Sequence, residues 1–285
     1  MKPRGNVAHY YDRNTGRFLR FGGGGVSHAI HRQLWGPGVT TAEAAAGYIN
    51  LRIVEKIEEI LPSEPAGIVD MGCGVGGTVF HLAEQFPRTR FTGITISPRQ
   101  HGIATRLADE RLLAERCRFL EHDFQSFDPG AVADVVVAIE SFTHSDTPQL
   151  FFSTAAGLLR AGGFAILVDD FLDGDPEKGA WAPGQVSALR KGWRLKSLCA
   201  VSECTNAAER NGLRVVSQTD LTGFIRLGRP RDRLISLFSP LMERLQLVGI
   251  PFFGNMIGGN ALQMGLQGGY LKYHMLVLRK EEPSG

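Results

Sequence analysis

The stretch Val69-Asp70-Met71-Gly72-Cys73-Gly74-Val75-Gly76-Gly77 decides the fold of this chain. Its first residues continue a short apolar run that begins at Gly67, which is typical of a buried strand. The glycines that follow allow the backbone to turn sharply and to approach a ligand closely. Their pattern, G-x-G-x-G-G after an acid, differs from the G-x-G-x-x-G of dinucleotide-binding loops, and no lysine stands at the P-loop spacing. The stretch therefore predicts a strand, a ligand-binding loop and a helix.

Strands and helices alternate around this loop. A helix is predicted from Thr41, which can cap it, to about Leu61, because apolar residues recur at helical spacing before Pro62. Further strands are predicted over residues 90–95, 118–121, 133–139 and 163–168, with helices following the glycine loop, beginning near Pro98 after the cap Ser97, and covering 149–159. This order predicts an α/β fold with a parallel sheet and helices on both faces.

The last third of the chain is less regular. We expect a helix over residues 197–211, a strand over 213–218, a helix over 229–246, an irregular stretch or loosely packed helix over 251–269, and a closing strand over 270–279. The predicted organisation is an N-terminal segment (1–61), a ligand-binding core (62–219), an insertion (220–269) and the closing strand with its tail (270–285). We expect the N-terminal segment and the insertion to form a cap over the substrate site.

Composition excludes several classes of function. The 285 residues include 31 basic and 29 acidic side chains, a net charge of +2, so no general attraction to nucleic acid or anionic membranes follows. No secretory signal is apparent at the start, and the late apolar stretch 245–269 is too interrupted for a membrane span. The four cysteines, at positions 73, 117, 199 and 204, lack metal or disulfide spacing, which favours free thiols in a reducing cytoplasm. We expect a cytoplasmic protein that acts on a small molecule, without nucleic acid, membrane span or metal site; a homo-oligomer is left open.

The glycine-loop stretch resembles motif I of the class I S-adenosylmethionine-dependent methyltransferases, and the resemblance covers about residues 60–170 and the closing strand. It implies a Rossmann-like, mostly parallel seven-stranded sheet and S-adenosyl-L-methionine as the methyl donor. In that family the loop passes beneath the amino-acid part of the donor, which implies contacts from Gly72 and Gly74. The residue that matches Asp70 orients the loop or the ammonium of the donor. A glycine turn that merely connects a strand to a helix is the alternative.

Two further stretches extend the implied donor site. Gly93-Ile94-Thr95-Ile96-Ser97-Pro98-Arg99-Gln100 resembles the G-(I/L)-T-(I/L)-S-x-x-Q form of sterol, cyclopropane fatty acid and prenyl diphosphate methyltransferases, and it lacks the ribose-binding acid of dinucleotide sites. The resemblance implies donor contacts from Thr95, Ile96 and Gln100. Asp123 and Phe124 match the acid that binds the adenine amino group and the residue that flanks the ring. The alternatives are a helix cap at Ser97 with a solvated Gln100, and a surface turn at Asp123.

The N-terminal segment carries a second resemblance. His9-Tyr10-Tyr11-Asp12 is similar to the Y-Y or H-Y-D stretch of the same group, which implies that Tyr11 contacts the donor carboxylate. Ala29-Ile30-His31-Arg32-Gln33-Leu34-Trp35-Gly36 resembles the aromatic, histidine-rich stretch of geranyl diphosphate C-methyltransferase. That resemblance implies a cation pocket formed by Trp35, with His31 nearby, because an indole face stabilises positive charge. A plain core role for Trp35 is the alternative.

Glu140 is the main candidate for acceptor chemistry. It follows the apolar strand over 133–139, and the carboxyl ends of parallel strands line the ligand crevice. Apolar surroundings can raise the proton affinity of a carboxylate, which suits a general base. The motif Ile139-Glu140-Ser141-Phe142-Thr143-His144 resembles the strand end of terpene and sterol C-methyltransferases, which implies that Glu140 accepts a proton from the methylated cation or holds it electrostatically. The alternative is a buried acid hydrogen-bonded to the N-terminal segment or to the donor.

A diphosphate acceptor would also need positive charge. Two basic clusters could supply it, Arg13, Arg17, Arg20 and Arg32 in the N-terminal segment, and Arg190, Lys191, Arg194 and Lys196 around Trp193. A solvated face is the alternative for the second cluster. No Asp-rich motif for binding magnesium appears, so any Mg²⁺ would accompany the diphosphate substrate.

Three functional hypotheses follow. The leading one is C-methylation of an alkene carbon of an isoprenoid, most concretely a geranyl- or farnesyl-type prenyl diphosphate, in terpenoid secondary metabolism. The second is O- or N-methylation of a natural product in an apolar pocket that could include Phe142, Phe171, Phe224, Phe238, Phe252 and Phe253. The third is a donor-binding protein without catalysis, or a nucleotide-binding dehydrogenase, which the missing ribose acid and the glycine spacing disfavour.

Overall fold

The computed structural model describes residues 31–173, 183–229, 232, 235–239, 242 and 250–282. Within these residues the chain forms one seven-stranded sheet with the strand order β3-β2-β1-β4-β5-β7-β6. The strands are β1 (Gly67–Met71), β2 (Arg90–Thr95), β3 (Cys117–Glu121), β4 (Ala133–Ile139), β5 (Leu159–Leu172), β6 (Leu213–Asp220) and β7 (Leu271–Lys280). Strands β1 to β5 pair in parallel, and β7 runs antiparallel to both of its neighbours. The predicted Rossmann-like, mostly parallel sheet is confirmed.

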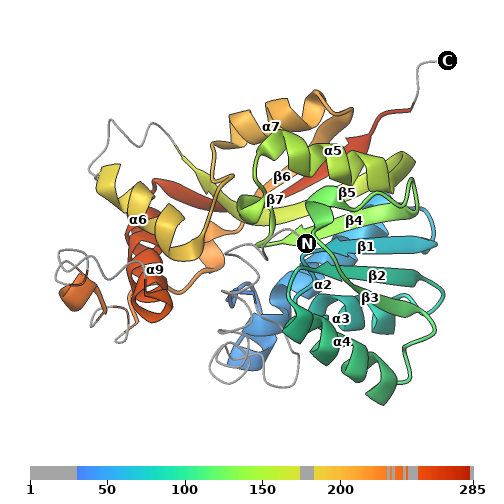
Figure 1. The fold of residues 1–285 in the computed structure, drawn as a ribbon, viewed down its shortest axis with the longest axis horizontal. Helices are drawn as coiled ribbons and strands as arrows, with labels where there is room; N and C mark the ends of the chain where they lie inside the picture. The colour runs from blue at the N-terminus through green and yellow to red at the C-terminus, as the bar shows by residue number, and fades with distance from the viewer. Residues whose placement is uncertain are drawn as a thin grey trace.

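Helices cover both faces of this sheet (Figure 1). Helices α2 (Ala42–Ile60), α3 (Gly77–Gln85) and α4 (Pro98–Glu110) lie on one face, and α5 (Pro148–Leu158) and α7 (Val201–Glu209) lie on the other. One core cluster joins α2 and α3 to the sheet through residues such as Ile49, Phe80 and Phe91. A second cluster, with Phe142, Phe151 and Phe171, fills the opposite layer. Burial of such side chains stabilises the fold by about 1.5–3 kcal/mol each.

Local sequence sets the helix starts. The side chains of Thr41, Ser97 and Thr147 each accept a hydrogen bond from the backbone N–H three residues later, at α2, α4 and α5. Proline occupies the first turn of α4 and of α5, where a missing N–H costs nothing. Short 3₁₀ turns, η1 (Phe124–Ser126), η2 (Phe142–His144) and η3 (Thr222–Phe224), follow β3, β4 and β6. These caps fix where each helix leaves the sheet edge.

The structure departs from the sequence expectations in the last half. Strand β5 is longer than predicted, since it runs over Leu159–Leu172. Of the two alternatives for residues 251–269 the structure has the helix, α9 (Pro251–Gln267), and it is closely packed. Helix α6 (Pro183–Trp193) was not predicted. Most of the helix expected over 229–246 lies outside the described residues.

Helices α6 and α9 pack closely against each other, away from the main helical layers (Figure 1). A Cβ added to Gly192 of α6 would lie 2.9 Å from the Cα of Gly258 of α9, and the indole N–H of Trp193 donates to the Asn255 carbonyl at 3.2 Å. Glycine is unfavourable inside a helix, but here it permits close helix contact, so tertiary packing outweighs propensity. The described part of the insertion therefore pairs with a helix that precedes β6. Among the described residues, no helix is long and apolar enough to cross a bilayer.

The strand order reverses between β1 and β4. From β1 the chain passes outward through β2 and β3, and β4 then returns to the other side of β1. Ligands of open α/β sheets bind outside the carboxyl ends of the strands at such a switch point. The glycine loop after β1 and Glu140 after β4 both stand at this point.

Candidate active site

The loop after β1 has a backbone that only glycine tolerates well. Gly72, Gly74 and Gly76 have φ values of 98°, 56° and 87°. A Cβ on Gly72 would lie 2.5 Å from the Cβ of Ser141, and one on Gly76 would lie 2.7 Å from the Phe119 ring. The N–H groups of Gly72 and Cys73 donate to the Ile94 carbonyl at 2.9 and 3.0 Å, which ties the loop to β2. The loop is therefore a fixed cradle of the kind that approaches a ligand through its backbone.

Asp70 is a buried carboxyl at the end of β1. Its side chain is 4% exposed, and burial raises its pKa to about 7. No hydrogen bond to its side chain is recorded among the described residues. A cation at this position would favour the ionised form and offset the desolvation cost. The donor expected from the sequence carries an ammonium group, so the cradle and Asp70 together fit S-adenosylmethionine.

Thr95 and Gln100 are brought together at the end of β2. Both are buried, and the Thr95 hydroxyl donates to Gln100 Oε1 at 2.8 Å. Ser97 caps α4 by accepting from the Gln100 N–H at 3.2 Å. The cap is confirmed, but Gln100 is not solvated. Ile96 is half-buried between them.

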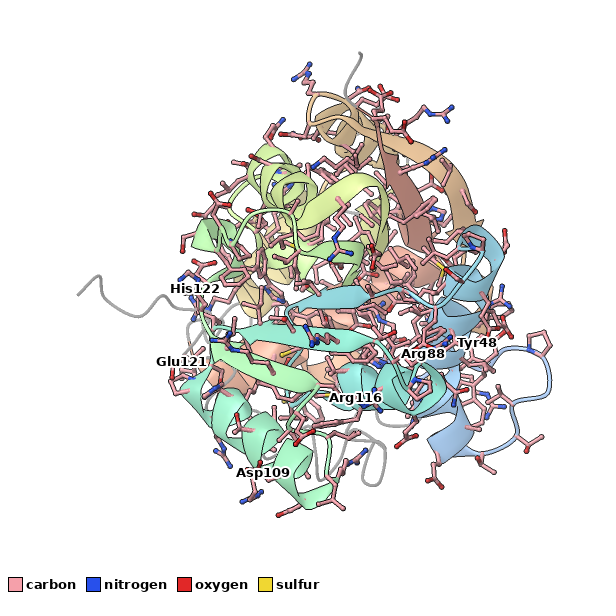
Figure 2. All side chains as sticks on the ribbon, turned by 90° about the vertical axis from the view of Figure 1, so that its right-hand side faces the viewer. Tyr48, Arg88, Asp109, Arg116, Glu121 and His122 are labelled. Carbon is pink, nitrogen blue, oxygen red and sulfur yellow. The ribbon has the colours of Figure 1, made fainter. Side chains whose placement is uncertain are left out.

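Asp123 starts the 3₁₀ turn after β3. Its Oδ1 accepts from the Gln125 backbone N–H at 3.0 Å and from Gln125 Nε2 at 3.3 Å. His122 N–H donates to the Thr95 carbonyl at 3.0 Å, which places this turn beside the end of β2. The ring of Phe124 packs edge-on against Phe151 at 5.9 Å. In Figure 2, Glu121 and His122 mark the carboxyl end of the strands, and Arg88, just before β2, marks the opposite end.

Glu140 lies in a strained backbone conformation at the end of β4. Its φ is +50°, a value that is rare outside glycine and concentrates at functional sites. Its Oε1 accepts three hydrogen bonds, from Arg32 N at 3.1 Å, Arg32 Nε at 3.0 Å and the Tyr273 hydroxyl at 3.0 Å. The expected alternative contact with the N-terminal segment is therefore confirmed.

Arg32 joins Glu140 to β5 and β7. Its two terminal nitrogens bind Asp170 in a fork, at 2.9 Å to Oδ1 and 2.6 Å to Oδ2. Its guanidinium lies 4.4 Å from the centre of the Tyr273 ring. The preceding residue in β5, Asp169, accepts hydrogen bonds from the backbone N–H and the hydroxyl of Thr143, both at 3.1 Å. We call Arg32, Glu140, Asp170 and Tyr273 the strand-end network.

The strand-end network lowers the pKa of Glu140, the opposite of the direction expected from the sequence. Burial alone would raise its pKa, but the charge and hydrogen bonds of Arg32, with those of Tyr273, hold it below the ordinary value. The prediction of a raised proton affinity is therefore wrong, because Arg32 and Tyr273 hydrogen-bond to the carboxylate and stabilise its charged form. Burial raises the pKa of Asp170 against the opposing effect of Arg32, and burial with the charge of Asp170 raises that of Asp169 to about 7.

His31 and Trp35 lie in the segment that enters the network. Both ring nitrogens of His31 are buried, and within the described part of the chain neither has a hydrogen bond of ordinary geometry. Burial lowers the pKa of His31, while the charge of Glu140 acts in the opposite direction. Arg226 stacks on Trp35, with its Cζ 3.3 Å from the ring centre. One face of the indole is thus already covered by a cation. The backbone N–H of Trp35 donates to the Phe224 carbonyl at 2.7 Å, which joins the segment to the chain after β6.

Several expected residues are not gathered at the site. In the second basic cluster, Lys196 pairs with Asp146 at 2.5 Å, Arg190 donates to the Leu198 carbonyl at 2.8 Å, and Lys191 is exposed. The phenylalanines do not form one pocket, because Phe142 and Phe171 belong to the core whereas Phe238 and Phe252 are about half exposed. Tyr11, Arg13, Arg17 and Arg20 lie outside the described residues.

Sequence reasoning missed three members of the site, Asp169, Asp170 and Tyr273. The acids follow the apolar part of the fifth strand, as Glu140 follows the fourth, and this similarity was the available signal. Tyr273 gave no comparable signal, because an aromatic residue within a strand is ordinarily a packing residue. Tyr273 lies opposite Asp170 in the antiparallel register of β7 and β5, and this pairing is set only by the sheet.

Comparison with known proteins agrees with this geometry. Residues 69–165 match the family model of a methyltransferase domain. Ajmaline N-methyltransferase of Rauvolfia serpentina is 25% identical over 96% of this chain and 97% of its own length. Chloroplastic tocopherol O-methyltransferase of Arabidopsis thaliana is also 25% identical, over 76% of this chain, which spans 65% of that relative. A geranyl diphosphate methyltransferase structure superimposes with a TM-score of 0.70 at 18% identity, over 97% of this chain and 99% of that one.

The domain match begins within β1 and includes the glycine loop, the ends of β2 and β3, and Glu140. The fold, the glycine cradle beside a buried acid, and the methyltransferase relatives lead to one assignment. The chain carries a methyltransferase domain, and its fold is that of the class I S-adenosylmethionine-dependent methyltransferases.

Proposed function

We propose that this enzyme methylates a small, largely apolar acceptor at a centre that gains positive charge during transfer. One observation carries the proposal: Glu140, at the switch point of the sheet, is held as an anion by Arg32 and Tyr273. A fixed carboxylate aimed at a developing cation stabilises the transition state more than the ground state.

The donor side of the proposal uses the residues predicted from the sequence. When bound, S-adenosylmethionine supplies an activated methyl group, so the protein has mainly to align the acceptor and exclude water. The residues proposed to hold the donor are Tyr11, Asp70, Gly72, Gly74, Thr95, Ile96, Gln100, Asp123 and Phe124. Among those described, the glycine cradle and the buried Asp70 give the most direct support.

The first acceptor class is an isoprenoid alkene. As the new C–C bond forms, the bond from the methyl carbon to the donor sulfur would break, with S-adenosylhomocysteine as the leaving group and a carbocation on the acceptor. Loss of a neighbouring proton to Glu140 would restore an alkene. A carboxylate with a lowered pKa is sufficient here, because such a cation is a very strong acid. His31 and the uncovered side of Trp35 would form part of the pocket wall.

A prenyl diphosphate remains part of this proposal, but Arg32 is an unsuitable partner for it. Its guanidinium is already bound to Asp170 and Glu140. The diphosphate would therefore take its positive partners elsewhere, from Mg²⁺ or from other basic residues. The expected setting, terpenoid secondary metabolism in the cytoplasm, stays a prediction.

The second acceptor class is a lipophilic amine. Glu140 and Asp170 both bind the single guanidinium of Arg32, and a third acid, Asp169, precedes Asp170 and is bonded to Thr143. These acids favour a neutral amine whose nitrogen becomes cationic as the N–CH3 bond forms, any proton on that nitrogen having first passed to a carboxylate or to solvent. The ajmaline relative, which aligns over nearly the whole of both chains, methylates nitrogen by its name. An oxygen acceptor would instead need a base, for which the neutral His31 is the described candidate.

The test is an assay with methyl-labelled S-adenosylmethionine. The acceptors should include geranyl and farnesyl diphosphate with and without Mg²⁺, an uncharged isoprenoid, a phenol and a lipophilic tertiary amine. We expect turnover of the uncharged isoprenoid or the amine, and Glu140→Gln should lower kcat by about 10²-fold or more while S-adenosylhomocysteine still binds in calorimetry. Full activity in Glu140→Gln would rule out this role for Glu140.

A further inference from the structure

The two oxygens of Glu140 have different surroundings. All three recorded hydrogen bonds to its carboxylate end on Oε1. None of the recorded hydrogen bonds within the described residues ends on Oε2. The side chain of Glu140 is 25% exposed, compared with 14% for Arg32 and 4% for Asp170. Among the residues that the structure describes, the carboxylate is thus held through Oε1, and Oε2 has no hydrogen-bond donor.

The donors that hold Oε1 are themselves fixed. Arg32 is bound in a fork by Asp170 and stacks on the Tyr273 ring. Tyr273 is fully buried, and its backbone N–H donates to the Thr222 hydroxyl at 2.9 Å. A carboxylate ordinarily rotates freely about its last torsion, but donors from two separate chain segments restrict this rotation. The orientation of Oε2 is therefore set by the fold.

We propose that Arg32 and Tyr273 are positioning residues, which hold Oε1 of Glu140 so that Oε2 faces the acceptor as a fixed anion. This inference rests on the proposed function, because it takes Glu140 to contact the acceptor. The forked hydrogen bond from Arg32 to Asp170 is needed for this positioning role. It fixes the guanidinium, so Arg32 orients the carboxylate and cannot swing across to cover Oε2.

The arrangement also defines what Oε2 accepts. The charged or titratable groups that face Glu140 come from the N-terminal segment, η2, β5 and β7: His31, Arg32, His144, Asp169, Asp170 and Tyr273. Burial lowers the pKa of both histidines, to about 4 for His144, so neither adds positive charge at neutral pH. Oε2 therefore suits an acceptor group that brings a proton or a developing positive charge.

The first test needs no acceptor. The side-chain carboxyl carbons of glutamate are labelled with ¹³C, and the protein saturated with S-adenosylhomocysteine is titrated by NMR, with Glu140→Gln to assign the signal. We expect Glu140 to titrate below the ordinary range in the wild type. Arg32→Met should raise that pKa by about one unit or more, and Tyr273→Phe and Arg32→Lys by less. Arg52→Met, which removes an exposed ion pair with Glu55, is the matched control and should leave the signal unchanged.

The second test uses whichever acceptor the wild type methylates. Tyr273→Phe should lower kcat about tenfold, with little change in KM for the donor, and should move the acid limb of the kcat profile to higher pH. An unshifted titration in both Tyr273→Phe and Arg32→Met would overturn the inference, even if both variants are less stable. Failure of the proposed function looks different: the wild type would bind no S-adenosylhomocysteine or methylate no acceptor, while the titration would still report on Arg32 and Tyr273.

Discussion

Asp70, which is buried, and Glu140, which is partly buried, are carboxyls at neighbouring strand ends, and their surroundings shift their pKa values in opposite directions. Burial raises the pKa of Asp70 to about 7. For Glu140 the effect of burial is outweighed by Arg32, and the pKa is lowered. The difference is a neighbouring cation. Glu140 has one within the protein, Arg32, whereas Asp70 is proposed to receive one, the ammonium group of the bound donor.

Asp70→Asn should stabilise the free enzyme and abolish donor binding. Between the ordinary carboxyl pKa and about 7, folded Asp70 holds a proton that the unfolded chain has released. The free energy of unfolding therefore falls as the pH rises through this window. Above about pH 7, the folded protein bears the whole free-energy cost of keeping ionised Asp70 buried. At about pH 8 the variant should gain on the order of 2–4 kcal/mol in urea unfolding. Asp169, whose pKa is also raised to about 7, should preserve part of the pH dependence. Unchanged stability together with normal affinity for S-adenosylhomocysteine would contradict both roles.

At the scale of elements, the glycine loop depends on space as well as on backbone freedom. Gly72→Ala should lower donor affinity severely and destabilise the fold by several kcal/mol, because its Cβ would lie 2.5 Å from that of Ser141. Gly130→Ala is the matched control. Gly130 has a positive φ of 77° but nothing within 4 Å of an added Cβ, so strain alone should cost about 1 kcal/mol. Thermal unfolding and calorimetry with S-adenosylhomocysteine measure both effects; equal losses in the two variants would show that the loop is not closely packed.

The packing of α6 on α9 offers a separate test of the cap. Gly192→Ala should push these helices apart, since its Cβ would lie 2.9 Å from the Cα of Gly258. If the cap shapes the acceptor pocket, KM for the acceptor should rise while donor affinity stays unchanged. Gly157→Ala, in the exposed turn of α5 with nothing within 4 Å, should instead add about 0.5–1 kcal/mol of stability. If Gly192→Ala changed the affinity for the donor but not the KM for the acceptor, α6 and α9 would not shape the acceptor pocket.

At the scale of the whole molecule, the four cysteines report on opening of the core. All are buried free thiols, and burial raises the pKa of Cys117 to about 11 and that of Cys199 to about 12. The native enzyme should therefore react slowly with a thiol reagent, whereas the urea-unfolded chain should react at once. Cys73 lies in the glycine loop, so S-adenosylhomocysteine at about 100 times its Kd should slow its labelling about 100-fold. Labelling of Cys73 that ignores this ligand would argue against donor binding at the loop.

Much of the core followed from local sequence. The strand over Gly67–Met71 and the helix caps at Thr41 and Ser97 were predicted where the structure has them, because hydrophobic periodicity, capping side chains and glycine geometry act over a few residues. The glycine loop and the strand-end Glu140 were found for the same reason. Helices α6 and α9 were missed or misjudged, because their glycines weaken a local helix signal and become favourable only when the two helices meet.

By itself, the sequence determined the order of the strands and of the helices that cover the sheet, the glycine loop after β1, and the presence of a carboxyl at the end of β4. Only the tertiary structure decided the state of that carboxyl. The strand-end network joins residues that lie 30 to more than 100 positions apart in the sequence, namely Arg32, Glu140, Asp170 and Tyr273. The fold of the sheet brings them within hydrogen-bond distance. Proton affinity depends on charges a few ångströms away in space, which no local pattern records.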